Sequence, residues 1–168
     1  YVQAPTITVA GPTARTLATS NVSLANDTFT ITGHNMRTGT SVTYNSQGGT
    51  NLAQNSGDIA DDTELFVIRV DDDTIKLATS LSNAQAGTAI DMTGGSSNVG
   101  NNSQTLTGTT ATATATVSGG IVTGITVTAV GSDYQTTPAI TVEAPKMTIP
   151  RSAVNASTNV ITFADHGL

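Results

Sequence analysis

The residues best suited to chemistry are acidic side chains crowded into one part of the sequence. Seven of the twelve acidic residues lie within sixteen positions: Asp58, Asp61, Asp62, Glu64, Asp71, Asp72 and Asp73. Carboxylate oxygens at close spacing are the ligands that Ca²⁺ prefers. Their spacing lacks the alternating Asp-x-Asp-x-Asp-Gly pattern with a distal Glu that marks a Ca²⁺ loop. Asp also suits turns, and its charge protects edge strands from aggregation. We favour the turn, assign no metal ligand, and keep Ca²⁺ binding by residues 58–73 as the alternative.

Two histidines are the next candidates, because each follows a predicted strand. A catalytic His needs a nucleophile or a carboxylate within hydrogen-bond range. Asp165 precedes His166, but Gly33 stands in the equivalent place before His34, so the pair does not recur. We therefore predict that these histidines sit in turns and bond to backbone groups.

The remaining candidates have structural interpretations. Tyr1 and Tyr134 each stand four residues before a Pro; we predict packing over a sheet, with contact to sugar or protein as the alternative. The Gly pairs at 48–49, 94–95 and 119–120 lack the phosphate-loop spacing and predict turns. Asn-x-Ser/Thr triplets, which matter only in a glycosylating host, begin at Asn21, Asn26, Asn101 and Asn155. We predict a non-enzymatic protein with no catalytic residue and no cofactor.

These residues are set in an internal repeat, which dictates architecture. Residues 1–12 and 134–145 align at an offset of 133, and residues 28–36 and 160–168 align at an offset of 132. The chain therefore holds one full period of about 133 residues and part of a second. The second copy stops inside a motif that continues in the first, so we expect both ends to be cuts through a longer chain or processed ends.

The amino-acid composition argues against nucleic-acid-binding and membrane-spanning proteins. The 168 residues carry a net charge of −6, include no Cys and are only 4% aromatic. A polyanion would be repelled, so we predict no nucleic-acid partner. No apolar run approaches the roughly 20 residues of a membrane span. Abundant Thr, Val and Ile favour pleated strands with thin aliphatic cores.

Strand patterns occupy most of the chain. We predict strands at 6–9, 28–32, 41–44, 65–70, 74–78, 88–92, 109–117, 121–130, 139–142 and 160–163. Residues 65–78 predict a hairpin, placed centrally because both of its faces carry aliphatic side chains. Gly124 predicts a bulge, and residues 80–87 predict one short helical turn. Residues 15–23 are predicted as a connection and residues 45–62 as an exposed loop.

The repeat and these strands predict an all-β fold, with small β-sandwich or β-hairpin modules in tandem in an elongated, fibre-like array. We expect the following parts: 1–23, the tail strand of a preceding B-type module and a connector; 24–92, an A-type module; 93–104, a Gly/Ser/Asn linker; 105–145, a three-stranded B-type module; and 146–168, a connector and the first strand of the next A-type module.

The residues also resemble a known family. Residues 28–44 and 64–91 are similar to a repeat module of bacteriophage virion structural and tail-fibre proteins, particularly of phages that infect cyanobacteria, and similar modules occur in large bacterial surface adhesins. Residues 160–168 resemble the opening of the same module. Residues 119–142 are similar to a second short β module of phage proteins, which carries Gly where this chain has Asp133. The resemblance implies a virion or cell-surface setting and no catalytic residues.

Two functional hypotheses follow. The first is a structural component of a virion or extracellular fibre that self-associates. The second is an adhesin or a receptor- or glycan-binding module, whose loop at 45–62 and acidic hairpin face a glycan or a protein. A polysaccharide depolymerase has no residue support. Because the strands at 6–9 and 160–163 lack their own hairpin or module, we expect either a longer chain or β-strand addition between neighbouring subunits.

Overall fold

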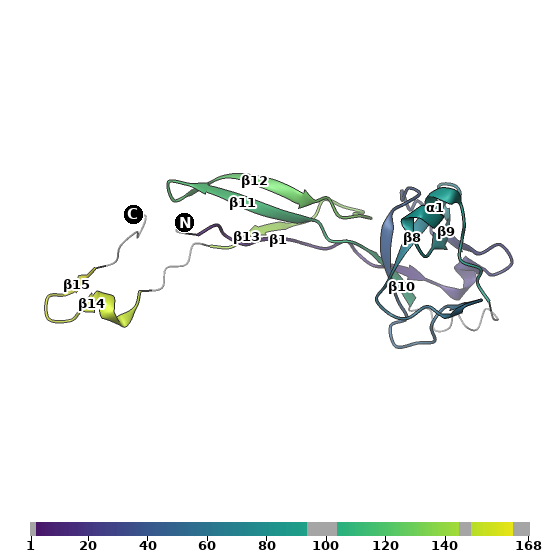
Figure 1. Cartoon of the computed structure of the whole chain (residues 1–168), viewed down its shortest axis with the longest axis horizontal. Helices are drawn as coiled ribbons and strands as arrows, with labels where there is room; N and C mark the ends of the chain where they lie inside the picture. The colour runs from purple at the N-terminus through teal and green to yellow at the C-terminus, as the bar shows by residue number, and fades with distance from the viewer. Residues whose placement is uncertain (1–2, 94–103, 145–148, 163–168) are drawn as a thin grey trace. The chain divides into compact units, whose positions relative to one another are not determined.

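The computed structural model describes residues 3–93, 104–144 and 149–162, and they confirm the all-β prediction (Figure 1). The chain forms two compact units. Residues 11–110 and 131–138 form the first, here called the module; residues 1–10, 111–130 and 139–168 form the second, here called the ribbon unit. The chain therefore passes between the units several times, whereas the sequence predicted modules that follow one another along the chain.

The module is built on one seven-stranded antiparallel sheet. In spatial order its strands are β2 (Arg15–Leu17), β10 (Gln104–Gly108), β5 (Ser41–Asn45), β8 (Thr63–Arg69), β9 (Thr74–Ala78), β4 (Thr28–Thr30) and β3 (Val22–Ser23). The predicted hairpin is confirmed as β8–β9, with Phe66 opposite Ala78, and β8 is the middle strand of the seven. Leu65 and Val67 are buried while Phe66 and Ile68 are half-buried, so the hairpin uses both of its faces.

The predicted helical turn is helix α1 (Leu81–Ala86). The hydroxyl of Ser80 accepts a hydrogen bond from the Asn83 N–H, which satisfies one of the free amides of the first turn. Gly87 ends the helix at φ 74°, a conformation that Gly adopts without steric cost. No regular strand follows. Residues 88–92 make scattered single links instead; for example, the Ile90 N–H donates to Leu77 O at 2.8 Å, and Met92 forms a bridge to Gln54.

The prediction of an exposed loop at residues 45–62 is correct for the exposure of more than half of these residues, but wrong in treating the whole stretch as a loop. This stretch contains the two-stranded hairpin of β6 (Ala53–Gln54) and β7 (Gly57–Asp58). Leu52 and Ile59, which flank the hairpin, are buried in the core of the module. Single apolar residues within a polar stretch have no periodicity, but here both belong to the buried core of the module.

The prediction of a connection at residues 15–23 is also wrong. This stretch supplies β2 and β3 at the two edges of the sheet, with a 3-10 turn, η1 (Thr19–Asn21), between them. Leu17 of β2 is fully buried. β2 and β3 are too short to show an alternating pattern in the sequence. They are strands only because they hydrogen-bond to the neighbouring strands β10 and β4.

The ribbon unit contains the predicted hairpin of β11 (Thr112–Ser118) and β12 (Ile121–Ala129). Gly119 and Gly120 form its turn, both with positive φ. The predicted bulge is confirmed, because Thr116 lies opposite Gly124 while Val117 lies opposite Val122. The prediction of a three-stranded unit at 105–145 is wrong: residues 104–108 enter the sheet of the module as β10, where Leu106 is fully buried, and β13 (Ile140–Val142) does not pair with β12.

The two copies of the repeated strand pair with each other. β1 (Ile7–Val9) lies antiparallel to β13, with Ile7 opposite Val142, Thr8 opposite Thr141 and Val9 opposite Ile140. Since Ile7 is the equivalent of Ile140 and Val9 of Val142, the pairing has a local two-fold axis between the two threonines. The expectation that β1 lacks a partner in its own chain is therefore wrong, because the second copy fills that place.

The C-terminal hairpin repeats a local structure of the module. The 3-10 turn η3 (Arg151–Ala153), β14 (Val154–Asn155) and β15 (Val160–Ile161) follow η1, β3 and β4 at an offset of 132. Their surroundings differ: Phe29 is 1% exposed and pairs with Ile75 of β9, whereas its equivalent Ile161 is 54% exposed. Most of the predicted linker at 93–104 and all of residues 163–168 lie outside the described residues.

Candidate functional site

The acidic residues of segment 58–73 do not converge on one point. Asp61 accepts a hydrogen bond from the Ser46 N–H at 2.6 Å, and Glu64 accepts one from the Ser41 hydroxyl at 2.5 Å. Within the described ranges, no group of three or more His, Cys, Asp or Glu residues is arranged to hold a metal ion. The carboxylates instead organise backbone and hydroxyl groups around the sheet.

The Asp71–Asp73 run forms the hairpin turn, as predicted. Asp71 accepts a hydrogen bond from the Asp73 N–H at 2.9 Å, and this bond lowers the pKa of the Asp71 carboxyl. Asp73 accepts a bond from the Gly33 N–H at 2.7 Å, which ties the hairpin to a second turn, and Asp72 pairs with Arg69.

His34 has the backbone partners that the sequence predicted. Its side chain is buried, Nδ1 accepts a hydrogen bond from the Met36 N–H at 2.9 Å, and Nε2 lies 3.0 Å from Asp71 O. An acceptor at Nδ1 and a carbonyl at Nε2 together define the neutral tautomer protonated on Nε2. His34 is thus a structural residue that braces two turns. Tyr134 is half-buried, while Tyr1, Asp165 and His166 lie outside the described residues.

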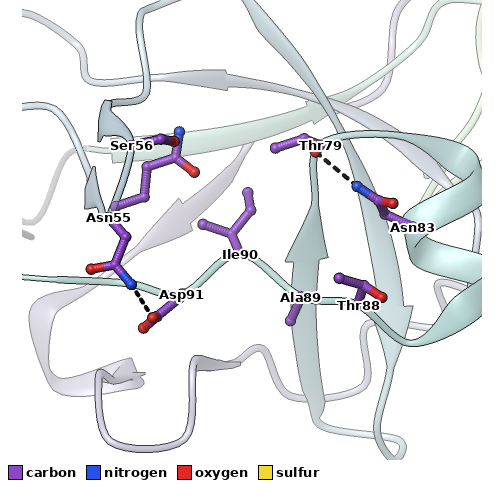
Figure 2. A pocket seen from close by; sticks show the side chains of 9 residues that line it. Asn55, Ser56, Thr79, Asn83, Thr88, Ala89, Ile90 and Asp91 are labelled. Atoms are coloured by element: carbon purple, nitrogen blue, oxygen red, sulfur yellow. Dashed lines mark hydrogen bonds between the residues drawn. The ribbon is translucent and has the colours of Figure 1, made fainter.

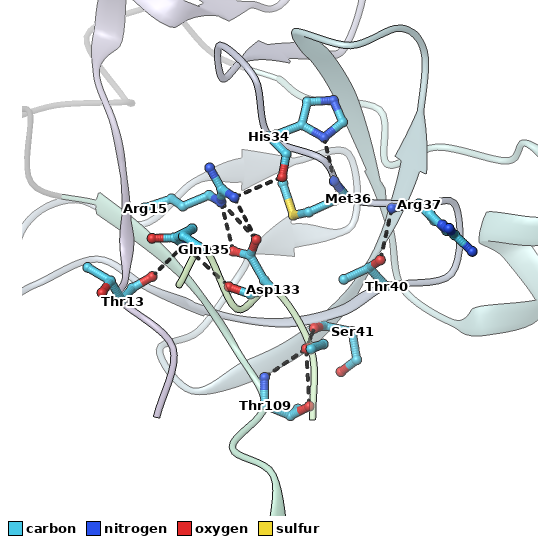
Figure 3. A network of polar contacts seen from close by, with 11 residues as sticks. Thr13, Arg15, His34, Met36, Arg37, Thr40, Ser41, Thr109, Asp133 and Gln135 are labelled. Carbon is cyan, nitrogen blue, oxygen red and sulfur yellow. Dashed lines mark hydrogen bonds and ion pairs between the residues drawn. The ribbon is translucent and has the colours of Figure 1, made fainter. Parts of the chain in front are cut away.

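An ion pair in the module joins two residues 118 positions apart, Arg15 and Asp133 (Figure 3). Arg15 Nε donates to Asp133 Oδ2 and Nη2 donates to Oδ1, each at 2.7 Å, and Nη2 also donates to His34 O at 2.8 Å. The side chains are 13% and 1% exposed. A two-pronged Arg–carboxylate pair in this setting holds a precise orientation. No local pattern in the sequence indicates this pair, because the two residues lie 118 positions apart.

Ser132 holds the same segment, 131–138, against the sheet. Its hydroxyl donates to Ser41 O at 2.6 Å and accepts from the Thr109 N–H at 2.8 Å. Gly108 makes this approach possible, because a Cβ on it would stand 2.2 Å from Ser132 O. The segment is thereby locked onto the module through side-chain and backbone contacts.

A pocket of about 310 Å³ lies beside helix α1 (Figure 2); it is here called the polar pocket because seven of its nine lining residues are of polar types. It is lined by Gln54, Asn55, Ser56, Thr79, Asn83, Thr88, Ala89, Ile90 and Asp91. Asn55 and Asn83 stand on opposite sides of Ile90. The Asn55 amide donates to the Asp91 carboxylate, and the Asn83 amide donates to the Thr79 hydroxyl at 3.1 Å. The amides, hydroxyls and carboxylate around the aliphatic side chain of Ile90 offer the donors and acceptors that a neutral polyol needs. The loop predicted to face a ligand, 45–62, contributes Gln54, Asn55 and Ser56 to this pocket, whereas no sequence signal pointed to residues 79–91.

Tyr44 is a fully buried polar residue that sequence analysis treated only as part of a strand. Its hydroxyl accepts a hydrogen bond from the Leu52 N–H at 2.8 Å. Burial raises the pKa of the phenol, and the nearby Asp61 and Asp58 raise it further, although the Leu52 bond acts in the opposite direction. The contact anchors the start of the β6–β7 hairpin.

Searches of family models, curated proteins and solved structures found no match to the chain. In the part of the chain that the structure describes, no helix has the length and apolar character needed to cross a lipid bilayer.

Proposed function

We propose that this chain is a non-enzymatic structural protein of a virion or extracellular fibre, built from repeating β modules and acting through self-association. The observation that carries the proposal is the pairing of β1 with β13, in which two copies of the repeated strand recognise each other directly. The sequence resemblance to phage structural and tail-fibre modules supports the same setting.

The pairing suggests how one period would join the next. Each period contributes one strand equivalent to β1 and β13. When two such strands pair, their Ile and Val side chains lie on one face and their threonines meet on the other. Repeat proteins whose units contact chiefly their neighbours form extended arrays. We therefore propose an elongated fibre in which strand pairs of this kind link successive modules.

The distribution of charge supports self-association through the ribbon unit rather than through the module. Ten of the twelve acidic residues and four of the six basic residues belong to the module, which thus carries the whole net charge of −6. The ribbon unit is neutral, and residues 111–130 contain no charged side chain at all. A charged module keeps a protein soluble, while a neutral ribbon permits close approach of like chains.

Sedimentation velocity of the purified 168-residue chain over a wide range of concentrations tests the proposal. We expect species larger than 17.0 kDa that increase with concentration. A chain that stays at 17.0 kDa throughout would overturn self-association.

The polar pocket favours a second candidate, binding of a neutral glycan by an adhesin or receptor-binding module. Screening the chain on immobilised glycans would test it. Binding should be lost on Asn83→Ala, which removes an amide from the pocket wall, and kept on Asp72→Ala, which removes an exposed carboxylate elsewhere. Equal binding by both variants, or no binding by the parent chain, would remove this candidate.

A further inference from the structure

The tripeptide Ile-Thr-Val of the paired strands occurs a third time in this chain. Residues 7–9 and 140–142 form the β1–β13 pair, and Ile125, Thr126 and Val127 repeat the sequence in the middle of β12. β12 pairs on one side with β11, and its other edge has no ladder partner among the described strands. The third copy therefore has an open strand edge, and its sequence is the one through which the first two copies pair with each other.

The side chains of this third copy are exposed in a pattern that indicates a missing neighbour. The register places Ala113 opposite Val127 and Ala115 opposite Ile125, so one face of the β11–β12 ribbon is aliphatic. The β11 side of that face is half-buried, whereas Ile125 is 47% and Val127 59% exposed. Two strands are marginal by themselves and need further strands or packing to be stable.

Two of the usual protections of an open strand edge, charged residues and Pro, are absent here. Proteins guard such edges with charged residues, Pro or bulges. Residues 111–130 contain neither charge nor Pro. The two register shifts on β12 lie on either side of the triplet, between Val122 and Gly124 and between Val127 and Ala129, so residues 124–127, which contain the triplet, are left as a regular stretch. The triplet has the same length as the ladder between β1 and β13.

Resting on the proposed function of self-association, we propose that β12 pairs antiparallel with β12 of a second copy of this chain, about a two-fold axis between the two Thr126 residues. This register sets Ile125 opposite Val127 of the other copy and extends the aliphatic face across four strands. It reproduces the side-chain register of β1 and β13, where Ile7 faces Val142 and Thr8 faces Thr141. A second copy suits the edge because an uncharged, self-complementary strand offers nothing to a charged partner, and isologous contacts join identical surfaces.

Disulfide trapping tests the pairing, because the chain has no Cys of its own. Directly opposed residues of antiparallel strands have Cα atoms about 4.5–5.5 Å apart, which a disulfide can span. We expect Thr126→Cys to oxidise to a species of twice 17.0 kDa on a non-reducing gel. Thr114→Cys, which lies opposite Thr126 on β11, is the matched control and should stay single. The double variant Thr8→Cys, Thr141→Cys should form its disulfide within one chain and verifies that oxidation works.

Adding Ile125→Lys to Thr126→Cys should abolish the trapped dimer, because it places a charge in the aliphatic face. Equal trapping of Thr126→Cys and Thr114→Cys, or survival of the dimer with Ile125→Lys, would overturn the pairing. If the parent chain self-associates in sedimentation but Thr126→Cys is not trapped, only this interface fails. If the parent chain is a monomer at every concentration, the proposed function itself fails.

Discussion

The guanidinium of Arg15 donates two hydrogen bonds of 2.7 Å to the carboxylate of Asp133, and this ion pair joins the edge strand β2 to segment 131–138. The same guanidinium donates to His34 O, so one cation organises three separate parts of the module. The strength of the Arg15–Asp133 ion pair depends on burial, because water screens little of the charge on a carboxylate that is 1% exposed.

Removing the charge of Asp133 should therefore destabilise the module. Asp133→Asn preserves the positive φ of 52°, which Asn tolerates, but leaves Arg15 without its counter-charge. Loss of one partner of a buried ion pair costs about 3–5 kcal/mol. Denaturant unfolding measures the loss. Asp72→Asn is the control, since it breaks an exposed pair worth at most about 1 kcal/mol. Similar losses for both variants would contradict the role of burial.

A methyl group at position 108 should dislodge segment 131–138. In Gly108→Ala, the new Cβ would stand 2.2 Å from the backbone oxygen of Ser132, which cannot rotate away. Overpacking of this kind costs about 1–3 kcal/mol. Gly124→Ala is the matched control in a strand, because no atom lies within 4 Å of its Cβ position. Limited proteolysis should cut Gly108→Ala within 131–138 faster than the parent chain or Gly124→Ala, and equal cleavage rates would refute the contact.

The repeat offers a matched pair of substitutions at equivalent positions. Phe29→Ala removes a side chain that is 1% exposed, and such changes cost about 3–5 kcal/mol. Ile161→Ala changes the equivalent residue, which is 54% exposed, and should alter the free energy of unfolding by no more than about 0.5 kcal/mol. Thermal unfolding of the two variants measures the difference. A large loss from Ile161→Ala would mean that the C-terminal hairpin is covered in solution.

Tyr44 should make the module sensitive to alkali. Its pKa is raised in the folded chain, so its contribution is complete below the unfolded pKa near 10 and is lost as the pH rises toward the folded value. We expect a smaller free energy of unfolding at pH 11 than at pH 8. Tyr44→Phe should reduce that pH dependence, and it should cost about 1–3 kcal/mol at pH 8 because the Leu52 N–H loses its buried acceptor. An unchanged slope in the variant would show that other groups cause the alkaline loss.

Local structure was predictable from the sequence because its causes lie within a few residues. Alternating side chains in 65–78 define the β8–β9 hairpin, Ser80 and Gly87 delimit helix α1, and the Gly119–Gly120 pair makes the turn of β11 and β12. The backbone partners of His34 followed in the same way, from a His placed in a turn. Each of these features depends on intrinsic conformational preference, which a short window of sequence records.

Tertiary structure alone decided which strands meet. The repeat revealed two copies of one strand but not that β1 and β13 would pair with each other. The Arg15–Asp133 pair, the polar pocket and the burial of Leu52 also depend on residues brought together from distant places. Short strands in a Thr-rich chain offer many partners of similar local quality. The packing of one shared core, and the need of buried polar groups for partners, select among these pairings. A short window of sequence contains neither kind of information.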